Sequence, residues 1–157
     1  MTNASQTNDA RTVAEAGARV ADIPWIGPLA IAGGCACGAV RYTAHGRMRP
    51  PIACHCEQCQ RASGHVVAAI QVEDAALTIT GEGAITWYRS SPIALRGFCR
   101  TCGGHLFFKP EGRGRTSIMA GTIERPHPPE LRLAAHIYCD DKADYYDIGD
   151  DGVARFA

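Results

Sequence analysis

Cysteine clustering constrains this chain more than any other feature of its sequence. Seven of its eight cysteines fall into three short motifs. The motifs are Cys35-Ala36-Cys37, Cys54-His55-Cys56-Glu57-Gln58-Cys59 and Cys99-Arg100-Thr101-Cys102. A Cys-x-x-Cys turn directs both sulfur atoms at one point about 2.3 Å from each, which is the length of a zinc–sulfur bond. The spacing therefore predicts zinc ligands.

The number of grouped thiolates indicates two sites rather than one. A closed zinc site takes four protein ligands and is structural, whereas a site with three keeps a position for water or substrate. Cys54, Cys56 and Cys59 form one compact motif, so we assign them to the open site. The closed site then takes the two remaining pairs, which are Cys35, Cys37, Cys99 and Cys102. Spacing alone does not say which pairs combine.

The alternative for these cysteines is disulfide bonds or free thiols, and the choice depends on the compartment. Residues 1–9 contain neither a basic residue nor an apolar run, so the sequence predicts no secretory signal. We therefore expect a cytoplasmic protein. Because the cytoplasm keeps thiols reduced, clustered cysteines there favour a metal over disulfides.

Length and charge narrow the class of protein further. At 157 residues, the chain is expected to form one domain of ordinary size. Sixteen basic residues balance sixteen acidic ones, and this balance lacks the positive footprint of a nucleic-acid-binding protein. The chain also lacks a polybasic segment for anionic lipid, and its apolar runs are too short to span a bilayer. We expect neither nucleic acid nor a membrane as a partner.

Turn residues and short alternating runs predict a mostly β fold. Residues 1–31 are rich in Ala, Asn, Thr and Ser and are expected to form a flexible arm, which leaves 32–157 as the zinc-binding domain. Beyond the arm, short apolar runs separated by Gly, Pro and Asp are typical of antiparallel sheet. Short helical turns are expected only at 57–62 and 126–130. The expected strands are residues 39–43, 66–72, 76–80, 85–89, 93–98, 105–109, 116–120 and 133–138.

Four segments resemble, in their order along the chain, the motifs of one protein family. They are residues 33–42, 54–64, 98–108 and 136–143. With these segments the chain resembles the glutathione-dependent formaldehyde-activating enzymes, a family that includes centromere protein V-like proteins. The resemblance extends from about residue 33 to residue 156. The ordered set is far more specific than any single motif.

The resemblance implies a fold, two zinc ions per chain and an activity. The implied fold is the β-tent type, in which zinc knuckles hold antiparallel sheets together. The implied ligand sets agree with the division made from the residues, so Cys54, Cys56 and Cys59 would form the active centre. The implied activity is that of a carbon–sulfur lyase, which joins a thiol, typically glutathione as co-substrate, reversibly to an aldehyde.

Other side chains are candidates for contacts with the substrate. Arg61 closely follows the middle motif and is predicted to pair with an anionic thiol such as glutathione. The reaction also needs a proton donor, for which the sequence offers His55, His65 and Tyr146. The thiol and the aldehyde are not identified by the residues.

Two departures from the family and one isolated cysteine leave alternatives open. Asp144 and Tyr145 stand where the family usually has proline and tryptophan, and they would alter the substrate if their segment borders the pocket. Cys139 lies outside the motifs and is expected to be a small buried residue. An exposed, reactive Cys139 would instead indicate a redox enzyme like the methionine sulfoxide reductases. Without an open site, the protein would be a non-catalytic zinc module. The sequence also leaves a homo-oligomer open.

Overall fold

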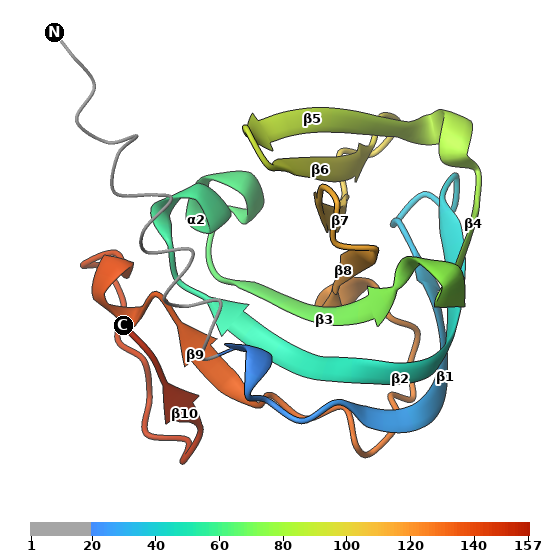
Figure 1. Ribbon diagram of the computed structural model, residues 1–157. Coiled ribbons are helices and arrows are strands. Elements are labelled where there is room, and N and C mark those ends of the chain that lie inside the picture. The colour runs from blue at the N-terminus through green and yellow to red at the C-terminus, as the bar shows by residue number, and fades with distance from the viewer. Residues whose placement is uncertain (1–19) are drawn as a thin grey trace, which may run out of the picture.

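The computed structural model describes residues 20–157, and their strands belong to one sheet (Figure 1). The strands are β1 Ile26–Gly34, β2 Arg41–Cys54, β3 Val67–Glu73, β4 Leu77–Thr80, β5 Ile85–Ser91, β6 Ala94–Cys99, β7 His105–Pro110, β8 Arg115–Met119, β9 Ala135–Ile137 and β10 Ala154–Arg155. The helices are α2 Glu57–Ser63 and the 3-10 turns η1 Asp74–Ala76, η2 Glu82–Ala84, η3 Ala120–Thr122 and η4 Cys139–Asp141. None of the helices in this part of the chain is long and apolar enough to cross a membrane.

Strand β2 is the strand on which the sheet is built. It has 14 residues and pairs with β1 and β4 along its first part and with β3 and β9 along its second. Its register with β3 shifts between Arg49 and Ile52. Pro50 and Pro51 lie at this shift, because a proline has no N–H to offer to a strand ladder. One long strand therefore carries the chain from the first cysteine motif to the second.

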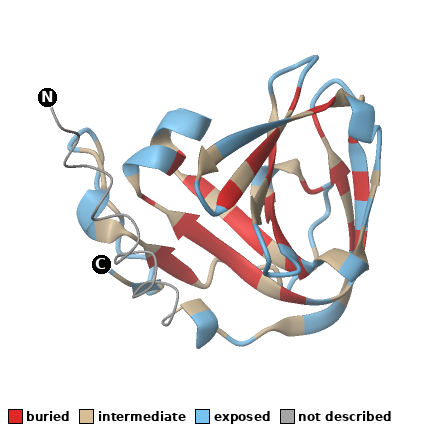
Figure 2. Cartoon of the chain, turned by 45° about the horizontal axis from the view of Figure 1, so that its top comes forward, coloured by how far each residue is buried: buried red, intermediate tan, exposed pale blue. Residues whose placement is uncertain are grey.

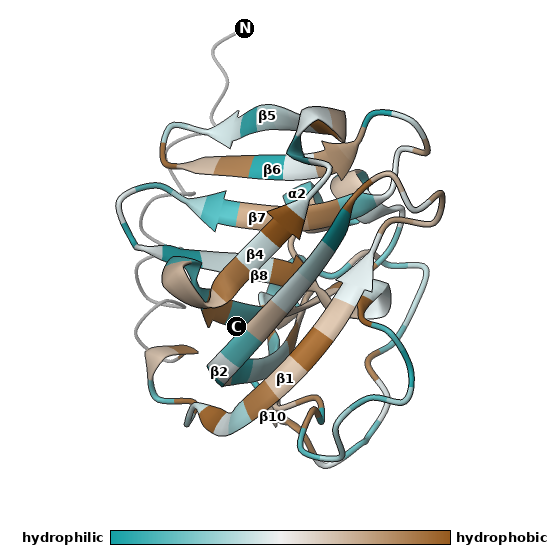
Figure 3. Ribbon diagram, turned by 90° about the vertical axis from the view of Figure 1, so that its right-hand side faces the viewer, coloured by the Kyte–Doolittle hydropathy of each residue, from teal (hydrophilic) through white to brown (hydrophobic). Residues whose placement is uncertain are grey.

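The sheet curls, so that β5 and β6 face β2 and β3 across the interior (Figure 1). Buried residues are frequent on β2, β3 and β6, whereas most of β5 is intermediate or exposed (Figure 2). Hydrophilic and more hydrophobic residues alternate along the first part of β2, as one-sided burial requires (Figure 3). The fully buried core side chains include Tyr42, Met48, Ile70, Val72, Leu106, Phe107 and Ile118. The rings of Tyr42 and Phe107 meet edge to face at 5.7 Å.

The prediction of a mostly β fold rich in antiparallel pairs is confirmed. Each of the eight predicted strands overlaps an observed one, and the helical turn predicted at 57–62 is α2. Two pairings are parallel, β2 with β9 and β9 with β10. A long connection rather than a hairpin leads from β8 to β9, which lies beside β2. Residues 126–130 form no helix, since three prolines remove backbone donors there.

Strand β1 begins within the stretch that composition assigned to the arm. The sequence places the boundary after residue 31, whereas β1 starts at Ile26 and pairs with β2 through Gly34. Gly27 and Pro28 lie at a register shift on this strand. Among the described strands, β1 pairs with β2 alone, and such an edge strand tolerates proline because one side of it needs few ladder donors. The rest of the predicted arm, residues 1–19, lies outside the described residues.

The turn between β4 and β5 provides a test of this packing. Gly81 has a φ of +78°, and a Cβ added there would collide with the carbonyl oxygen of Ala39. Gly83 has open space around it and no positive φ. We expect Gly81→Ala to lower the free energy of unfolding by about 1–3 kcal/mol, and Gly83→Ala to lower it far less. Urea denaturation measures both, and equal stability of the two variants would contradict the packing.

Candidate metal centres

The first cluster joins the two cysteine pairs that are far apart in the sequence. Cys35 and Cys37 lie in the turn between β1 and β2, whereas Cys99 ends β6 and Cys102 lies in the turn to β7. Their four sulfur atoms all lie within 4.8 Å of one another. The Cys37 sulfur is 3.5 Å from that of Cys35 and 3.7 Å from that of Cys99. The turns of two separate hairpins thus meet at one point.

The spacing of these sulfur atoms fits a zinc ion. Four sulfurs bound at about 2.3 Å around a tetrahedral centre stand about 3.8 Å apart, close to the observed distances. Backbone amides also point at the sulfurs, since the Val40 N–H donates to the Cys35 sulfur at 3.3 Å. The amide of Gly104 holds the pKa of Cys102 down, at about 6. A set of four thiolates is one that structural zinc sites use, so this cluster could hold zinc.

The second cluster lies where β2 ends and α2 begins. Cys54 is the last residue of β2, Cys56 caps α2 and Cys59 lies in the first turn of that helix. The Cys56 sulfur accepts a hydrogen bond from the Cys59 backbone N–H at 3.4 Å and lies 3.5 Å from the Cys54 sulfur. All three sulfurs lie within 4.8 Å of one another. The sulfur–sulfur distances are similar to those in the first cluster, so these cysteines could hold zinc as well.

Within residues 20–157, no fourth Cys, His, Asp or Glu joins this second cluster. His55 lies between two of its cysteines in sequence, and strand alternation turns it to the other side. The two ring nitrogens of His55 bond to the Tyr146 hydroxyl and to the His136 ring. His65 bonds through Nδ1 to the Tyr145 hydroxyl at 2.6 Å. Within the described chain, the second cluster therefore offers three ligand atoms, one fewer than the first.

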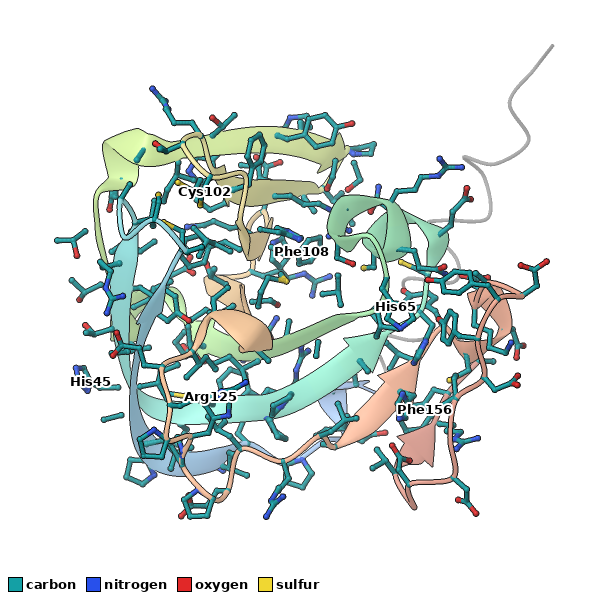
Figure 4. The ribbon with its side chains drawn as sticks, turned by 180° about the vertical axis from the view of Figure 1, so that it is seen from behind. His45, His65, Cys102, Phe108, Arg125 and Phe156 are labelled. Carbon is teal, nitrogen blue, oxygen red and sulfur yellow. The ribbon has the colours of Figure 1, made fainter. Side chains whose placement is uncertain are left out.

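A buried arginine from β6 lies against the second cluster. Arg96 is 6% exposed, and its Nη2 donates to the Cys59 sulfur at 3.7 Å and to Gln58 Oε1 at 2.9 Å. Its guanidinium lies 5.0 Å from the ring centroid of Phe108, which Figure 4 shows beside α2. Hydrogen bonds from the other two thiols, and then the charge of Arg96, lower the pKa of Cys59 to about 3. Arg96 is a residue that the sequence motifs did not reveal.

A chain of hydrogen bonds leads from the second cluster to the surface. The Tyr146 hydroxyl is 2.7 Å from His55 Nδ1, His55 Nε2 is 2.8 Å from His136 Nδ1, and His136 Nε2 is 2.9 Å from Asp151 Oδ2. Both histidines are buried. The hydrogen bond from His136 lowers the pKa of Asp151, so the carboxylate is ionised and only accepts. With a neutral His136, each histidine donates through Nε2 and His55 Nδ1 accepts the tyrosine hydroxyl.

The segment with the two departures from the family borders this cluster. The Tyr145 and Tyr146 rings lie 5.0 Å apart, and the His65 ring meets that of Tyr146 edge to face at 4.7 Å (Figure 4 labels His65). Burial raises the pKa of Tyr146, and the charges of neighbouring groups, Cys54 among them, raise it further. Tyr145 thus replaces the usual tryptophan at a position next to the candidate active centre.

Two other residues that the sequence singled out have different surroundings. Arg61 is exposed and pairs with Glu57, one helical turn earlier, at 2.7 Å. Cys139 is half-buried, and its backbone N–H donates to the Phe156 carbonyl at 3.0 Å. Burial raises the pKa of the Cys139 thiol. A raised pKa disfavours the thiolate, which is the reactive form that the redox-enzyme alternative needs.

Known proteins resemble this chain in both sequence motifs and fold. The family model described as glutathione-dependent formaldehyde-activating enzyme matches residues 30–141. A crystal structure of a Rhodobacter sphaeroides protein, a Northeast Structural Genomics target, has the same fold at 20% identity. The match covers 80% of this chain and 99% of that chain, with a TM-score of 0.54. None of the curated proteins matches the chain significantly. The family match spans most of the chain and includes both cysteine clusters, and the chain belongs to the glutathione-dependent formaldehyde-activating enzyme family.

Proposed function

We propose that this protein is a zinc-dependent carbon–sulfur lyase, which joins a small thiol of the glutathione type reversibly to an aldehyde. The observation that carries the proposal is the difference between the two clusters. One offers four cysteine sulfurs and the other, within residues 20–157, offers three. Four thiolates close a zinc site, whereas three leave a position for substrate. Family membership supports thiols and aldehydes as the substrate classes.

The proposal assigns one zinc ion to each cluster. In the four-cysteine cluster the ion would be structural, because every ligand position is taken by the protein. Two of those ligands, Cys35 and Cys99, are also members of the apolar core. In the three-cysteine cluster, zinc would favour the thiolate form of a substrate thiol and hold it beside the aldehyde. Arg96 lies against Cys59 and offsets the negative charge that the thiolates concentrate there.

Tyr146 is the group that we propose for proton exchange with the substrate. Its hydroxyl hydrogen is directed at His55 Nδ1, which leaves the oxygen lone pairs free to accept a hydrogen bond. In adduct breakdown, the proton of the adduct hydroxyl moves to Tyr146 while the tyrosine proton moves to His55. The O–H electrons form the C=O bond, and the C–S bond breaks with its electron pair on sulfur. Adduct formation follows the reverse course.

His136 and Asp151 act as positioning residues in this proposal. A histidine with one free nitrogen can donate or accept there, depending on its tautomer. The Asp151 carboxylate accepts from His136, and His136 then accepts from His55. This order keeps His55 Nδ1 unprotonated and ready to accept from Tyr146. The hydrogen-bond chain thus holds the Tyr146 hydrogen toward His55 and leaves the lone pairs of the hydroxyl oxygen for the substrate.

The two zinc ions should differ in their effect on stability. Structural zinc contributes roughly 10–16 kcal/mol in small peptides at neutral pH. We therefore expect Cys99→Ser to give an insoluble or molten chain, and Cys56→Ser to fold with one zinc instead of two. Cys139→Ser, outside both clusters, should keep both ions. Circular dichroism melts and zinc analysis check this. A wild-type melting temperature for Cys99→Ser would reject the structural assignment.

Cobalt substitution should make thiol binding at the three-cysteine cluster visible. Cobalt–thiolate charge-transfer bands respond to an added sulfur ligand, so glutathione should shift the visible spectrum of the cobalt protein. S-methylglutathione has no ionisable thiol and should leave the spectrum unchanged. The same spectrum with both compounds would show that the thiol does not bind the metal, and the proposed function would fail.

Removal of one hydroxyl should separate catalysis from thiol binding. We expect Tyr146→Phe to slow the breakdown of the formaldehyde–glutathione adduct by about 10²- to 10⁴-fold, the usual contribution of a general acid–base group. The cobalt spectrum should still respond to glutathione. Tyr145→Phe removes the neighbouring hydroxyl and should have a much smaller effect. NMR exchange measurements give the rate of adduct breakdown for the wild type and for both variants. A wild-type rate in Tyr146→Phe would eliminate Tyr146 as the proton acceptor.

A further inference from the structure

A pocket lies beside the three-cysteine cluster, between α2 and the β5–β6 hairpin. Its volume is about 370 Å³. Its walls include Gln58, Arg61, Tyr88, Arg96, Phe98 and His105. Strand register explains why these side chains converge: Tyr88 pairs with Arg96 between β5 and β6, and Phe98 pairs with His105 between β6 and β7. The end of β5 comes close to α2 (Figure 1). At this contact, the Gln58 side chain donates to the Ser90 carbonyl at 2.7 Å.

Arg96 brings a buried positive charge to this pocket. No carboxylate of the described residues pairs with it, and its neighbours are the Gln58 amide and the Cys59 sulfur. Both bonds are made by Nη2, and Nε is buried without a partner in the described chain. A buried donor that lacks a partner costs free energy, so the Nε–H of Arg96 is a candidate contact for a ligand.

His105 adds two more buried polar atoms to the same wall. Its Nδ1 and Nε2 are both buried, and neither has a side-chain partner within residues 20–157, although the Phe107 backbone interacts with the ring and raises its pKa. Burial, and then the charge of Arg96, lower the pKa of His105. The ring is therefore neutral and offers one N–H donor and one acceptor. Arg96 and His105 together present donors that a ligand with acceptor oxygens would satisfy.

We infer that this pocket binds a carboxylate of the thiol substrate, with Arg96 and His105 as its direct contacts. A carboxylate accepts from Arg96 Nε–H and from the His105 ring, and it neutralises the buried guanidinium. Arg96 also touches Cys59, so a ligand held here lies next to the three-cysteine cluster. The inference rests on the proposed function, in which the sulfur of the ligand binds at the three-cysteine cluster. It adds that the ligand must also carry a carboxylate.

The pocket also changes the expected role of Arg61. The sequence predicted that Arg61 pairs with an anionic thiol, and the side chain does line the pocket. It is 79% exposed, however, and already paired with Glu57. Exposed ion pairs contribute little because water screens them. The buried and unpaired Arg96 is therefore the stronger contact for a carboxylate, and Arg61 lies at the pocket rim.

Calorimetry with S-methylglutathione tests the pocket without the metal–sulfur bond. This compound keeps both carboxylates and has no ionisable thiol, whereas its diethyl ester has no carboxylate. We expect the ester to bind the wild-type zinc protein about ten- to a hundredfold more weakly, the usual effect of losing a charge-assisted hydrogen bond. Because this comparison uses the unchanged protein, it does not depend on whether a variant folds.

Variants then locate the effect in the pocket. Arg96→Gln should weaken S-methylglutathione binding by a similar factor and leave the weak binding of the ester unchanged. Arg89→Gln is the matched control, because Arg89 lies on β5 and pairs with Glu111 outside the pocket walls. It should bind S-methylglutathione as the wild type does. Equal losses in both variants would overturn the assignment to Arg96.

The remaining outcomes separate this inference from the proposed function. Equal affinities of the acid and its ester would overturn the carboxylate subsite, even if the cobalt spectrum responded to glutathione. Acetate that bound as tightly as S-methylglutathione would mark a general anion site and would also overturn it. A weaker ester with an unresponsive cobalt spectrum would support the subsite and reject the metal–thiol chemistry.

Discussion

The fold depends on the meeting of four cysteine sulfurs from two hairpins, in which Cys37 and Cys99 are 62 residues apart. The β1–β2 and β6–β7 hairpins share no strand pairing, because β3 and β8 separate them in the sheet. The cysteine side chains, together with the short link from β4 to β5, therefore close the curl of the sheet. Cys35 and Cys99 are packed in the apolar core as well as in the cluster. Hydrophobic packing thus stabilises the same junction that the proposed zinc ion would stabilise.

Strand β6 links the two clusters. It carries Arg96, which touches Cys59, and ends at Cys99 in the four-cysteine cluster. Three residues of strand span only about 10 Å. Strand β2 separates the same clusters by its 14 residues, or about 45 Å if it were straight. The curl accounts for both lengths, so the four-cysteine cluster helps to place the arginine that contacts the three-cysteine cluster.

The sequence predicted what local spacing encodes. Ligand counting divides the grouped cysteines into a set of four and a set of three, and the structure brings together the same two sets. The sets are Cys35, Cys37, Cys99 and Cys102, and Cys54, Cys56 and Cys59. Strand β1 was missed because Gly27 and Pro28 usually interrupt strands, and only pairing with β2 shows that an edge accommodates them. Arg96, His105, His136 and Asp151 gain their roles from strand pairing and loop position, which no motif records.

Strand β5 is the last strand of the sheet and pairs only with β6 in the described chain. It supplies Tyr88 to the pocket, and this side chain is 61% exposed. Local unfolding is easiest where a segment has few partners, whereas core strands open only with the whole domain. The pocket therefore has one wall that a single strand partner holds in place. A ligand that contacts this wall would stabilise the edge of the sheet.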